Sequence, residues 1–241
     1  MTTLAAPSSS VVPYVPWSEH HRAMVDNWTI EDTPHVSMIA PTGSGKTVLM
    51  TRGLMPALTD DQVLYFDVKG WDENINKLHM RRVRRFPTRF ERNMRDTEPQ
   101  AKWYVYRAND SVDTGNMMER AYAEGGWTMI LDEERAMTDR HPNLGLMPLI
   151  EKYRMRGRGR VSVISATQAP RFVASSFYEQ ASHLYIARVE DKRARRRLQE
   201  IGGDTDKIDQ VVSQLARHEF LYIGPLGAQG SRIMEVTKVD V

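Results

Sequence analysis

A glycine-rich segment between a strand-like run and a helix-like run constrains this chain more than any other feature. The segment reads Ala-Pro-Thr-Gly-Ser-Gly-Lys-Thr over residues 40–47, and it follows the apolar run 35–39. Strand, glycine-rich turn, Gly-Lys-Thr and helix in this order are typical of the phosphate-binding P-loop. The backbone N–H groups of such a loop bind phosphate oxygens, helped by the positive end of the following helix. The chain is therefore expected to bind a nucleotide.

The P-loop pattern gives each polar residue of the segment an expected role. Lys46 would reach the β- and γ-phosphates of ATP, and the Thr47 hydroxyl would ligate Mg²⁺. Ala40 stands where the pattern opens with glycine, which is tolerable if its φ is negative and only its backbone is used. The alternative is a chance glycine turn. The expected nucleotide-binding residues are Pro41, Thr42, Gly43, Ser44, Gly45, Lys46 and Thr47.

Composition limits the class of protein. With 241 residues, 41% of them hydrophobic and 27% charged, the chain suits one globular domain with a full-size core. It has no cysteine, which excludes disulfides, thiol catalysis and Cys-based zinc sites. We expect no secretory signal and no membrane span, because no run approaches the roughly 20 apolar residues that a span needs. A cytoplasmic location is the default expectation.

The order of apolar and helical runs predicts the fold. Residues 1–16 are rich in Ser and Pro and are expected to be a flexible arm, and 17–241 a single P-loop ATPase domain. Alternating strands and helices indicate βαβ units around a mainly parallel sheet flanked by helices. The last two strands are too close for a crossover helix and should form a C-terminal β-hairpin. We therefore predict an α/β fold with a RecA-like P-loop NTPase core. Expected strands are 35–39, 62–67, 102–107, 127–131, 160–166, 183–188, 219–223 and 232–239, and expected helices are 17–28, 114–124 and 143–155.

Two carboxylates follow the apolar run 127–131. A hydrophobic strand that ends in Asp-Glu is the Walker B arrangement, in which Asp132 would lie beside Thr47 and Mg²⁺ while Glu133 activates water. Buried carboxylates at a strand end need a cationic partner, and Mg·ATP supplies one. The alternative is an Asp-Glu pair that only opens the next helix. Glu134 follows immediately, and we favour Glu133 as the base because it directly follows the aspartate.

A further strand, 160–166, leads to Gln168. In a parallel sheet this residue would emerge beside the Walker B strand, within reach of the γ-phosphate or its attacking water. Its expected role is that of a sensor that couples hydrolysis to movement. The alternative is a strand-end glutamine that caps the next turn.

These pieces together resemble the HerA/FtsK superfamily of P-loop DNA-pumping ATPases. The resemblance adds Asp-Val-Lys-Gly at 67–70, Ala-Thr-Gln-Ala-Pro at 166–170 and an ending around 215–225 in which His218 replaces the usual glycine. It covers about residues 34–240. The family implies a ring, usually a hexamer, with ATP at subunit interfaces and double-stranded DNA in the pore.

The same resemblance implies an arginine that reaches the ATP of the neighbouring subunit. The Gly157-Arg158 pair matches the family best, so Arg158 is the expected residue, with Arg156 second. Removal of such an arginine costs about 10³–10⁵ in turnover where it has been measured. The alternative is a solvated basic loop that touches DNA phosphate.

Basic residues are concentrated in one tract. Seven arginines fall within residues 81–95 although the formal net charge is only +2, and this local patch suits a phosphate backbone. Contact without sequence preference is expected. The alternatives are a solvated insertion or a patch between subunits. A second cluster at 192–197 is expected to be an interface or solvated face. The expected nucleic-acid contacts are Arg81, Arg82, Arg84, Arg85 and Arg89.

The combined interpretation is an ATP-hydrolysing double-stranded DNA translocase that uses ATP and Mg²⁺. A stripped motor of this length is most like the small genome-packaging ATPases of viruses, an analogy that rests on size and architecture. It would work in the host cytoplasm or at a virion vertex, with a portal or capsid-vertex protein as a further partner. The alternatives are a plasmid-transfer or mobile-element DNA pump, an ATP-dependent switch that moves no DNA, and a small-molecule kinase.

Overall fold

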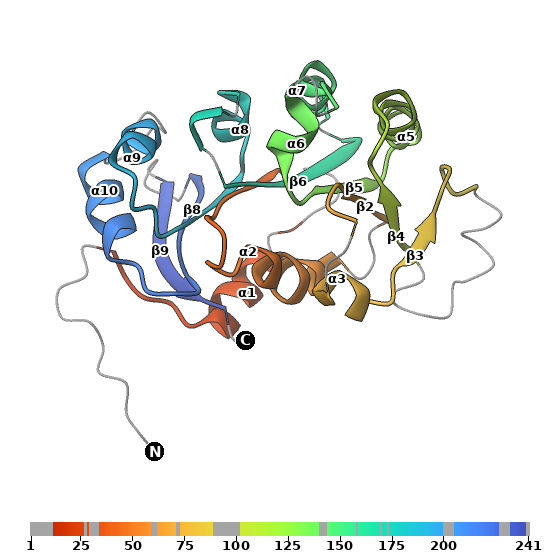
Figure 1. Ribbon diagram of the computed structural model, residues 1–241. Helices are drawn as coiled ribbons and strands as arrows, with labels where there is room; N and C mark the ends of the chain where they lie inside the picture. Colours follow the sequence, from red (N-terminus) through yellow and green to blue (C-terminus); the bar gives the residue numbers. More distant parts are fainter. Residues whose placement is uncertain are drawn as a thin grey trace.

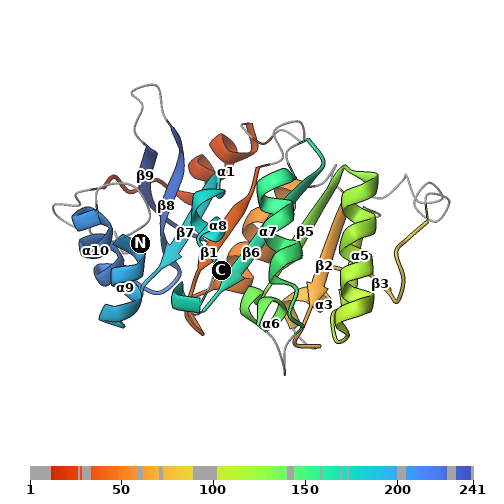
Figure 2. The same ribbon diagram turned by 90° about the horizontal axis from the view of Figure 1, so that it is seen from above.

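A nine-stranded sheet with helices on both faces forms the body of the molecule (Figure 1). The computed structural model describes residues 12–26, 28, 34–58, 62–70, 73–88, 102–139, 144–157, 159–168, 170–172, 174–199, 205–226 and 232–239. Neighbouring strands follow the order β3-β4-β2-β5-β6-β1-β7-β8-β9. Figure 2 shows this order across the sheet from above.

The strands from β1 to β7 pair in parallel, and β8 and β9 add an antiparallel hairpin at one edge. The expected α/β fold, with a mainly parallel sheet and a C-terminal hairpin, is therefore confirmed. The bounds are β1 Val36–Ile39, β2 Gln62–Asp67, β3 Arg81–Val83, β4 Trp103–Arg107, β5 Trp127–Leu131, β6 Val161–Thr167, β7 His183–Ala187, β8 Glu219–Leu226 and β9 Arg232–Lys238.

The helices divide between the two faces of the sheet, as Figure 1 shows. On one face lie α1 Trp17–Asp26, α2 Lys46–Val48 with its continuations η1 Leu49–Leu54 and η2 Met55–Leu58, and α3 Glu73–Lys77. On the other face lie α5 Ser111–Glu124, α6 Glu134–Thr138, α7 Met147–Arg156, α8 Ser176–Glu179, α9 Lys192–Gln199 and α10 Thr205–Gln214. The short turn η4 Pro170–Phe172 follows β6.

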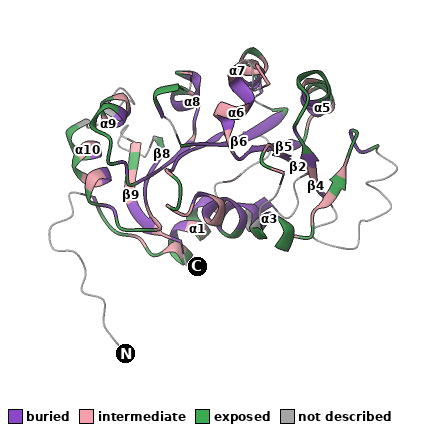
Figure 3. Ribbon diagram, viewed as in Figure 1, coloured by how far each residue is buried: buried purple, intermediate pink, exposed green. Residues whose placement is uncertain are grey.

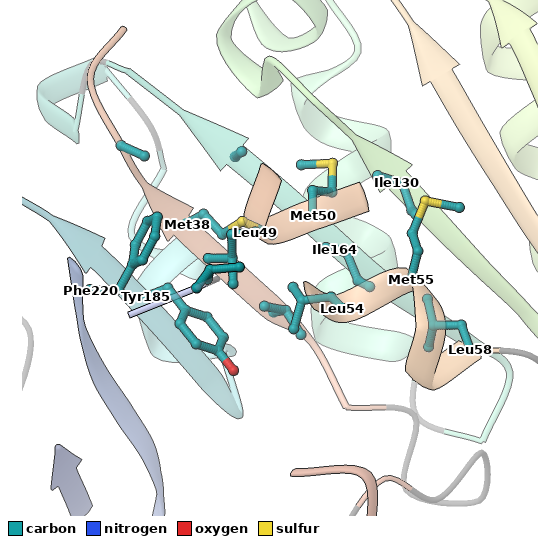
Figure 4. Close-up of a cluster of buried hydrophobic side chains, with 14 of the residues drawn as sticks. Met38, Leu49, Met50, Leu54, Met55, Leu58, Ile130, Ile164, Tyr185 and Phe220 are labelled. Carbon is teal, nitrogen blue, oxygen red and sulfur yellow. The ribbon is translucent and has the colours of Figure 1, made fainter. Parts of the chain in front are cut away.

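The central strands are buried on both faces (Figure 3). In β1, Met38 packs against the helix that follows the P-loop, while the next residue, Ile39, joins a separate cluster with α8, α9 and α10. Because both faces of such a strand are covered, its sequence is a continuous apolar run. Figure 4 shows the cluster beneath the P-loop helix, with Met38, Leu49, Met50, Leu54, Met55, Leu58, Ile130, Ile164, Tyr185 and Phe220.

Two helices begin at other residues than the sequence indicated. Helix α5 begins at Ser111 rather than at 114, because the Asp110 carboxylate caps it by accepting the N–H of Asp113 at 2.9 Å. Helix α7 begins at Met147 rather than at 143, and residue 143 lies outside the described residues. Pro148 sits in its first turn, where a missing backbone N–H breaks no helical hydrogen bond.

The two edges of the sheet also differ from expectation. Val15 donates its N–H to the Val236 carbonyl at 2.8 Å, and Val236 donates to Pro13 at 2.8 Å, so residues 12–16 run along β9. Residues 12–16 of the expected arm thus lie against the sheet, and residues 1–11 are outside the described residues. At the other edge, β3 begins the arginine tract, where no strand was expected.

Candidate nucleotide-binding site

The P-loop follows β1 directly. Ala40 is fully buried and donates its N–H to the Thr167 carbonyl at 3.0 Å. Its φ is not positive, so a side chain is accommodated where the pattern has glycine. Gly43 and Gly45 have φ values of +80° and +97°, which favour glycine, and Ser44 closes the turn by donating to the Pro41 carbonyl at 2.6 Å. The loop thus has the backbone form that its sequence indicated.

Lys46 connects this loop to the carboxylates at the end of β5. Its Nζ lies 2.8 Å from the Asp132 carbonyl oxygen, which it donates to, 3.3 Å from Glu133 Oε2 and 3.6 Å from Asp132 Oδ1. Lys46 is 6% exposed and Asp132 2%, so the ammonium offsets carboxylate charge that water cannot reach. The residues expected from the P-loop and Walker B patterns therefore meet at one place.

Glu134 occupies a different environment from Glu133. It is fully buried and its two carboxylate oxygens accept hydrogen bonds from the Arg154 guanidinium, one of them at 2.8 Å. Arg154 also donates to the Ser165 hydroxyl and lies over the Phe177 ring. Glu133 is 15% exposed at its side chain and faces Lys46. Of the two adjacent glutamates, only Glu133 faces the P-loop.

Lys69 is a site residue to which sequence reasoning gave no role. Its Nζ lies 2.6 Å from Asp132 Oδ2. The Asp-Val-Lys-Gly motif at the end of β2 was noted as part of the resemblance, but its sequence does not say where the lysine side chain points. Because β2 pairs directly with β5, the residues after both strands are neighbours at the carboxyl edge.

The segment before β8 covers the P-loop from the outside. Arg217 Nε donates to the Gly43 carbonyl at 3.3 Å, and a Cβ on Gly45 would lie only 2.4 Å from His218 Nδ1. Burial lowers the pKa of His218, and the charge of Arg217 adds to this shift. A pocket of about 260 Å³ is lined by these two residues and by Pro41, Thr42, Gly43, Gly45, Lys46, Thr47, Val48, Lys69 and Gln168.

Gln168 follows β6, which pairs with the Walker B strand β5 as expected and with β1 on its other side. Its side-chain Oε1 accepts a hydrogen bond from the Thr42 hydroxyl at 2.7 Å. The side chain is thus held against the tip of the P-loop and lines the same pocket as Lys46 and Thr47. The Gln168 amide can therefore contact a ligand that is bound in the P-loop.

The donor set fits a hard divalent cation. Asp132 Oδ1 is buried and has no hydrogen-bond partner among the described residues, and Thr47 lines the pocket at the P-loop together with Lys46 and Lys69, which both contact Asp132. Carboxylate and hydroxyl oxygens are the ligands that Mg²⁺ prefers, and it usually takes few of them from the protein alongside substrate phosphates. Within the described ranges, no group of three or more His, Cys, Asp or Glu residues offers a separate metal centre.

The candidate arginines after α7 have different positions. Arg158, the expected residue, lies outside the described residues, so its side chain is not placed. Arg156 is exposed at the end of α7. Arg154 is buried and paired with Glu134 inside its own chain.

The basic tract lies on an edge of the sheet. Arg81 and Arg82 belong to β3, Arg84 and Arg85 follow it, and Arg89 is not described. Arg82 donates to the Asn76 side chain at 2.8 Å. A pocket of about 400 Å³ at this edge is lined partly by Arg82, Arg84 and Arg107. This edge therefore carries a local positive charge.

Fold and strand order define the class: the architecture is that of the RecA-like P-loop ATPases. The genome-packaging NTPase B204 of Sulfolobus turreted icosahedral virus 2, in complex with sulfate, is similar with a TM-score of 0.62 and 14% identity over 87% of this chain and 98% of that one. The DNA-packaging ATPase B204 of Sulfolobus turreted icosahedral virus has a TM-score of 0.62 and 16% identity over 88% of this chain and 100% of that one. The pCW3 conjugation coupling protein TcpA, with ATPγS, has a TM-score of 0.58 and 12% identity over 88% of this chain and 62% of that one.

These neighbours are FtsK/HerA-type P-loop ATPases, so the resemblance drawn from the motifs is confirmed at the level of the fold. B204 of the second virus is also known in complexes with AMP, AMPPCP and ATP-gammaS. No model of a known protein family and no curated protein sequence matches the chain. None of the described helices is long and apolar enough to cross a membrane.

Proposed function

We propose that this chain is an ATP-hydrolysing motor that moves double-stranded DNA, most similar in role to viral genome-packaging ATPases. The observation that carries the proposal is the meeting of Lys46, Asp132 and Glu133, with the lysine Nζ 3.3–3.6 Å from both carboxylates. The Lys46 ammonium thus connects the phosphate-binding loop to two carboxylates at a strand end, and this arrangement suits a Mg·ATP substrate. The packaging neighbours, matched over nearly their whole length, support the DNA-moving role.

Each residue would act on ATP in its own way. Lys46 and the backbone N–H groups of 41–47 bind the β- and γ-phosphates, while Thr47 and Asp132 hold Mg²⁺. The metal, when bound, polarises the phosphoryl oxygens and neutralises charge that develops on them. Glu133 accepts a proton from the attacking water. Its side chain is 15% exposed, which leaves the carboxylate partly accessible to water.

Gln168 would report the presence of the terminal phosphate. The hydrogen bond from Thr42 to its side chain joins the P-loop to the end of β6. A movement of the P-loop when the terminal phosphate is lost would therefore be transmitted to β6 through this contact. Arg158 would act on the ATP of the neighbouring subunit in a ring, for which we take the hexamer of the family as the expected size. A portal or capsid-vertex protein is the proposed docking partner.

DNA would contact the basic edge at β3. Arg81, Arg82, Arg84 and Arg85 follow one another along this edge, and Arg89 continues the tract. Arginines that are not placed in a DNA groove by a helix or ribbon bind phosphates rather than base edges, so the contact would not depend on the DNA sequence. This suits a motor that must move along any DNA.

ATP hydrolysis with and without long double-stranded DNA, at low and moderate salt, tests the proposal. Wild-type protein should be strongly stimulated by DNA, and Glu133→Gln and Arg158→Ala should both lose turnover while they still bind ATP. Arg193→Ala, an exposed arginine of the second basic cluster, serves as the matched control and should behave as wild type. Hydrolysis that is indifferent to DNA would refute the motor and leave an ATP-dependent switch.

A plasmid-transfer DNA pump is a second candidate, favoured by the similarity to the conjugation coupling protein TcpA. Both candidates predict DNA-stimulated hydrolysis, so the assay above does not separate them. Binding to a purified portal or capsid-vertex protein does, because only the packaging motor requires that partner.

A further inference from the structure

The carboxylate proposed as a metal ligand already has two ammonium groups beside it. Lys69 Nζ lies 2.6 Å from Asp132 Oδ2, and Lys46 Nζ lies 3.6 Å from Oδ1. Lys46 belongs to the P-loop and has its own role toward phosphate. Lys69 has none in the proposed function, although it makes the shorter contact.

The local structure holds Lys69 in this position. At the end of β2 the Asp67 carboxylate oxygen Oδ1 accepts the backbone N–H groups of Lys69 at 3.1 Å and Gly70 at 2.7 Å. Gly70 has a φ of +79°, which lets the chain turn sharply at this point. The turn directs Lys69 across the carboxyl edge toward Asp132. The fixed turn and the lysine together explain an Asp-x-Lys-Gly motif.

Lys69 is the more exposed member of its pair with Asp132. Its side chain is 38% exposed while the Asp132 side chain is only 2% exposed, and Lys69 lines the pocket that contains the P-loop. The four-carbon stem of a lysine allows its charge to shift by several ångströms without a change in the backbone. The aspartate is fixed and the lysine is the partner that can leave.

We propose that Lys69 competes with Mg²⁺ for Asp132 and, when displaced, pairs with the terminal phosphate of ATP. Two cations on one buried carboxylate repel each other strongly at low dielectric, so a bound metal would drive the ammonium away. The terminal phosphate of ATP gives the displaced ammonium a new anionic partner. This inference rests on the proposed nucleotide site.

This competition affects the binding of ADP and ATP differently. With Mg·ADP there is no γ-phosphate for the displaced Lys69 to pair with, so its loss of Asp132 is uncompensated. With Mg·ATP the loss is offset by a charged hydrogen bond. Lys69 therefore makes the site select ATP over ADP, by about tenfold for one such bond.

Equilibrium binding of fluorescent ADP and ATP analogues across a Mg²⁺ titration tests this role. Lys69→Met should bind Mg·ADP more tightly than wild type, reach half-saturation at about tenfold less Mg²⁺ with ADP, and lose most of its preference for ATP. Lys69→Arg, which keeps the charge, should retain that preference. Lys77→Met is the matched control, because Lys77 is exposed and pairs with Glu73 one helical turn away, its one ion pair within the described part of the chain.

Thermal unfolding without Mg²⁺ gives an independent readout. Lys69→Met should lower the melting temperature, since Asp132 loses a partner, and Mg²⁺ with ADP should restore more of it than in wild type. If Lys69→Met does not fold, Lys69→Gln, which keeps a hydrogen-bond donor without the charge, carries the same comparison. An unchanged Mg²⁺ dependence and ATP preference in these variants would overturn the inference. Wild-type protein that binds neither nucleotide would instead overturn the proposed function.

Discussion

Replacing Arg154 by Met tests the buried ion pair that separates the two glutamates. Arg154 is 2% exposed and Glu134 is fully buried, and the guanidinium donates to both carboxylate oxygens. The substitution removes the cation and leaves the carboxylate without its partner and away from water. Breaking one side of a buried pair costs about 3–5 kcal/mol.

For a chain of this length, 1 kcal/mol corresponds to roughly 2–4 °C in melting temperature, so Arg154→Met should melt about 6–20 °C below wild type. A double variant, Glu134→Leu with Arg154→Met, removes both charges. It should recover most of the loss, because two apolar side chains of similar volume replace a buried pair at little cost. The recovery distinguishes an unpaired charge from a simple loss of packing.

Urea and thermal unfolding followed by circular dichroism supply the measurement. Lys152→Met is the control: it breaks a 3.1 Å pair with Glu119 whose side chains are 37% and 48% exposed, and should cost less than about 1 kcal/mol. A single variant within 1 kcal/mol of wild type, or a double variant as unstable as the single one, would show that the unpaired Glu134 charge does not set the loss of stability.

Three further predictions concern the backbone, pH and salt. Gly157→Ala should destabilise by about 1–3 kcal/mol in urea unfolding, since its Cβ would lie 2.2 Å from the Tyr153 carbonyl oxygen, whereas Gly115→Ala, within α5, meets only ordinary contacts and should stabilise slightly. Burial lowers the pKa of His183 to about 4 from 6.5, helped by His20, so the unfolded chain binds the extra proton. The free energy of unfolding should therefore keep the full His183 contribution above about pH 6.5 and fall as the pH is lowered toward 4. His183→Asn should make the free energy of unfolding less dependent on pH in this range. Binding to double-stranded DNA, measured against salt, should lose about 0.9 in log–log slope for each phosphate contact removed by alanine at Arg81, Arg82, Arg84 and Arg85.

The sequence predicts the central sheet well, because its physical signal is strong. Strands β2 and β5 are covered on both faces, so their apolar runs 62–67 and 127–131 match the observed bounds. The P-loop was equally readable, since its glycines are required by positive φ values. Where burial or backbone geometry restricts the residue type, the sequence alone is enough.

Other features leave no such mark. Strand β3 is a short edge strand that carries Arg81 and Arg82, and charge on an edge hides the alternation that identifies strands. The contact between Lys69 and Asp132 depends on strand order, which brings together residues far apart in the chain. Likewise, Glu133 and Glu134 are equivalent as letters, and only the position of Arg154 separates their environments.

The strip of residues 12–16 beside β9, followed by α1, joins regions that are remote in sequence. His20 contacts Glu235, 215 positions away, and Val15 pairs with Val236. Contacts of this range are the slowest to form, because a long loop must close first. The part of the sheet from β4 through β2 and β5 to β6 pairs strands that are much closer in sequence. We therefore expect the β9 edge to close late in folding, and until the N-terminal strip pairs with it, β9 presents unpaired backbone groups to a second chain.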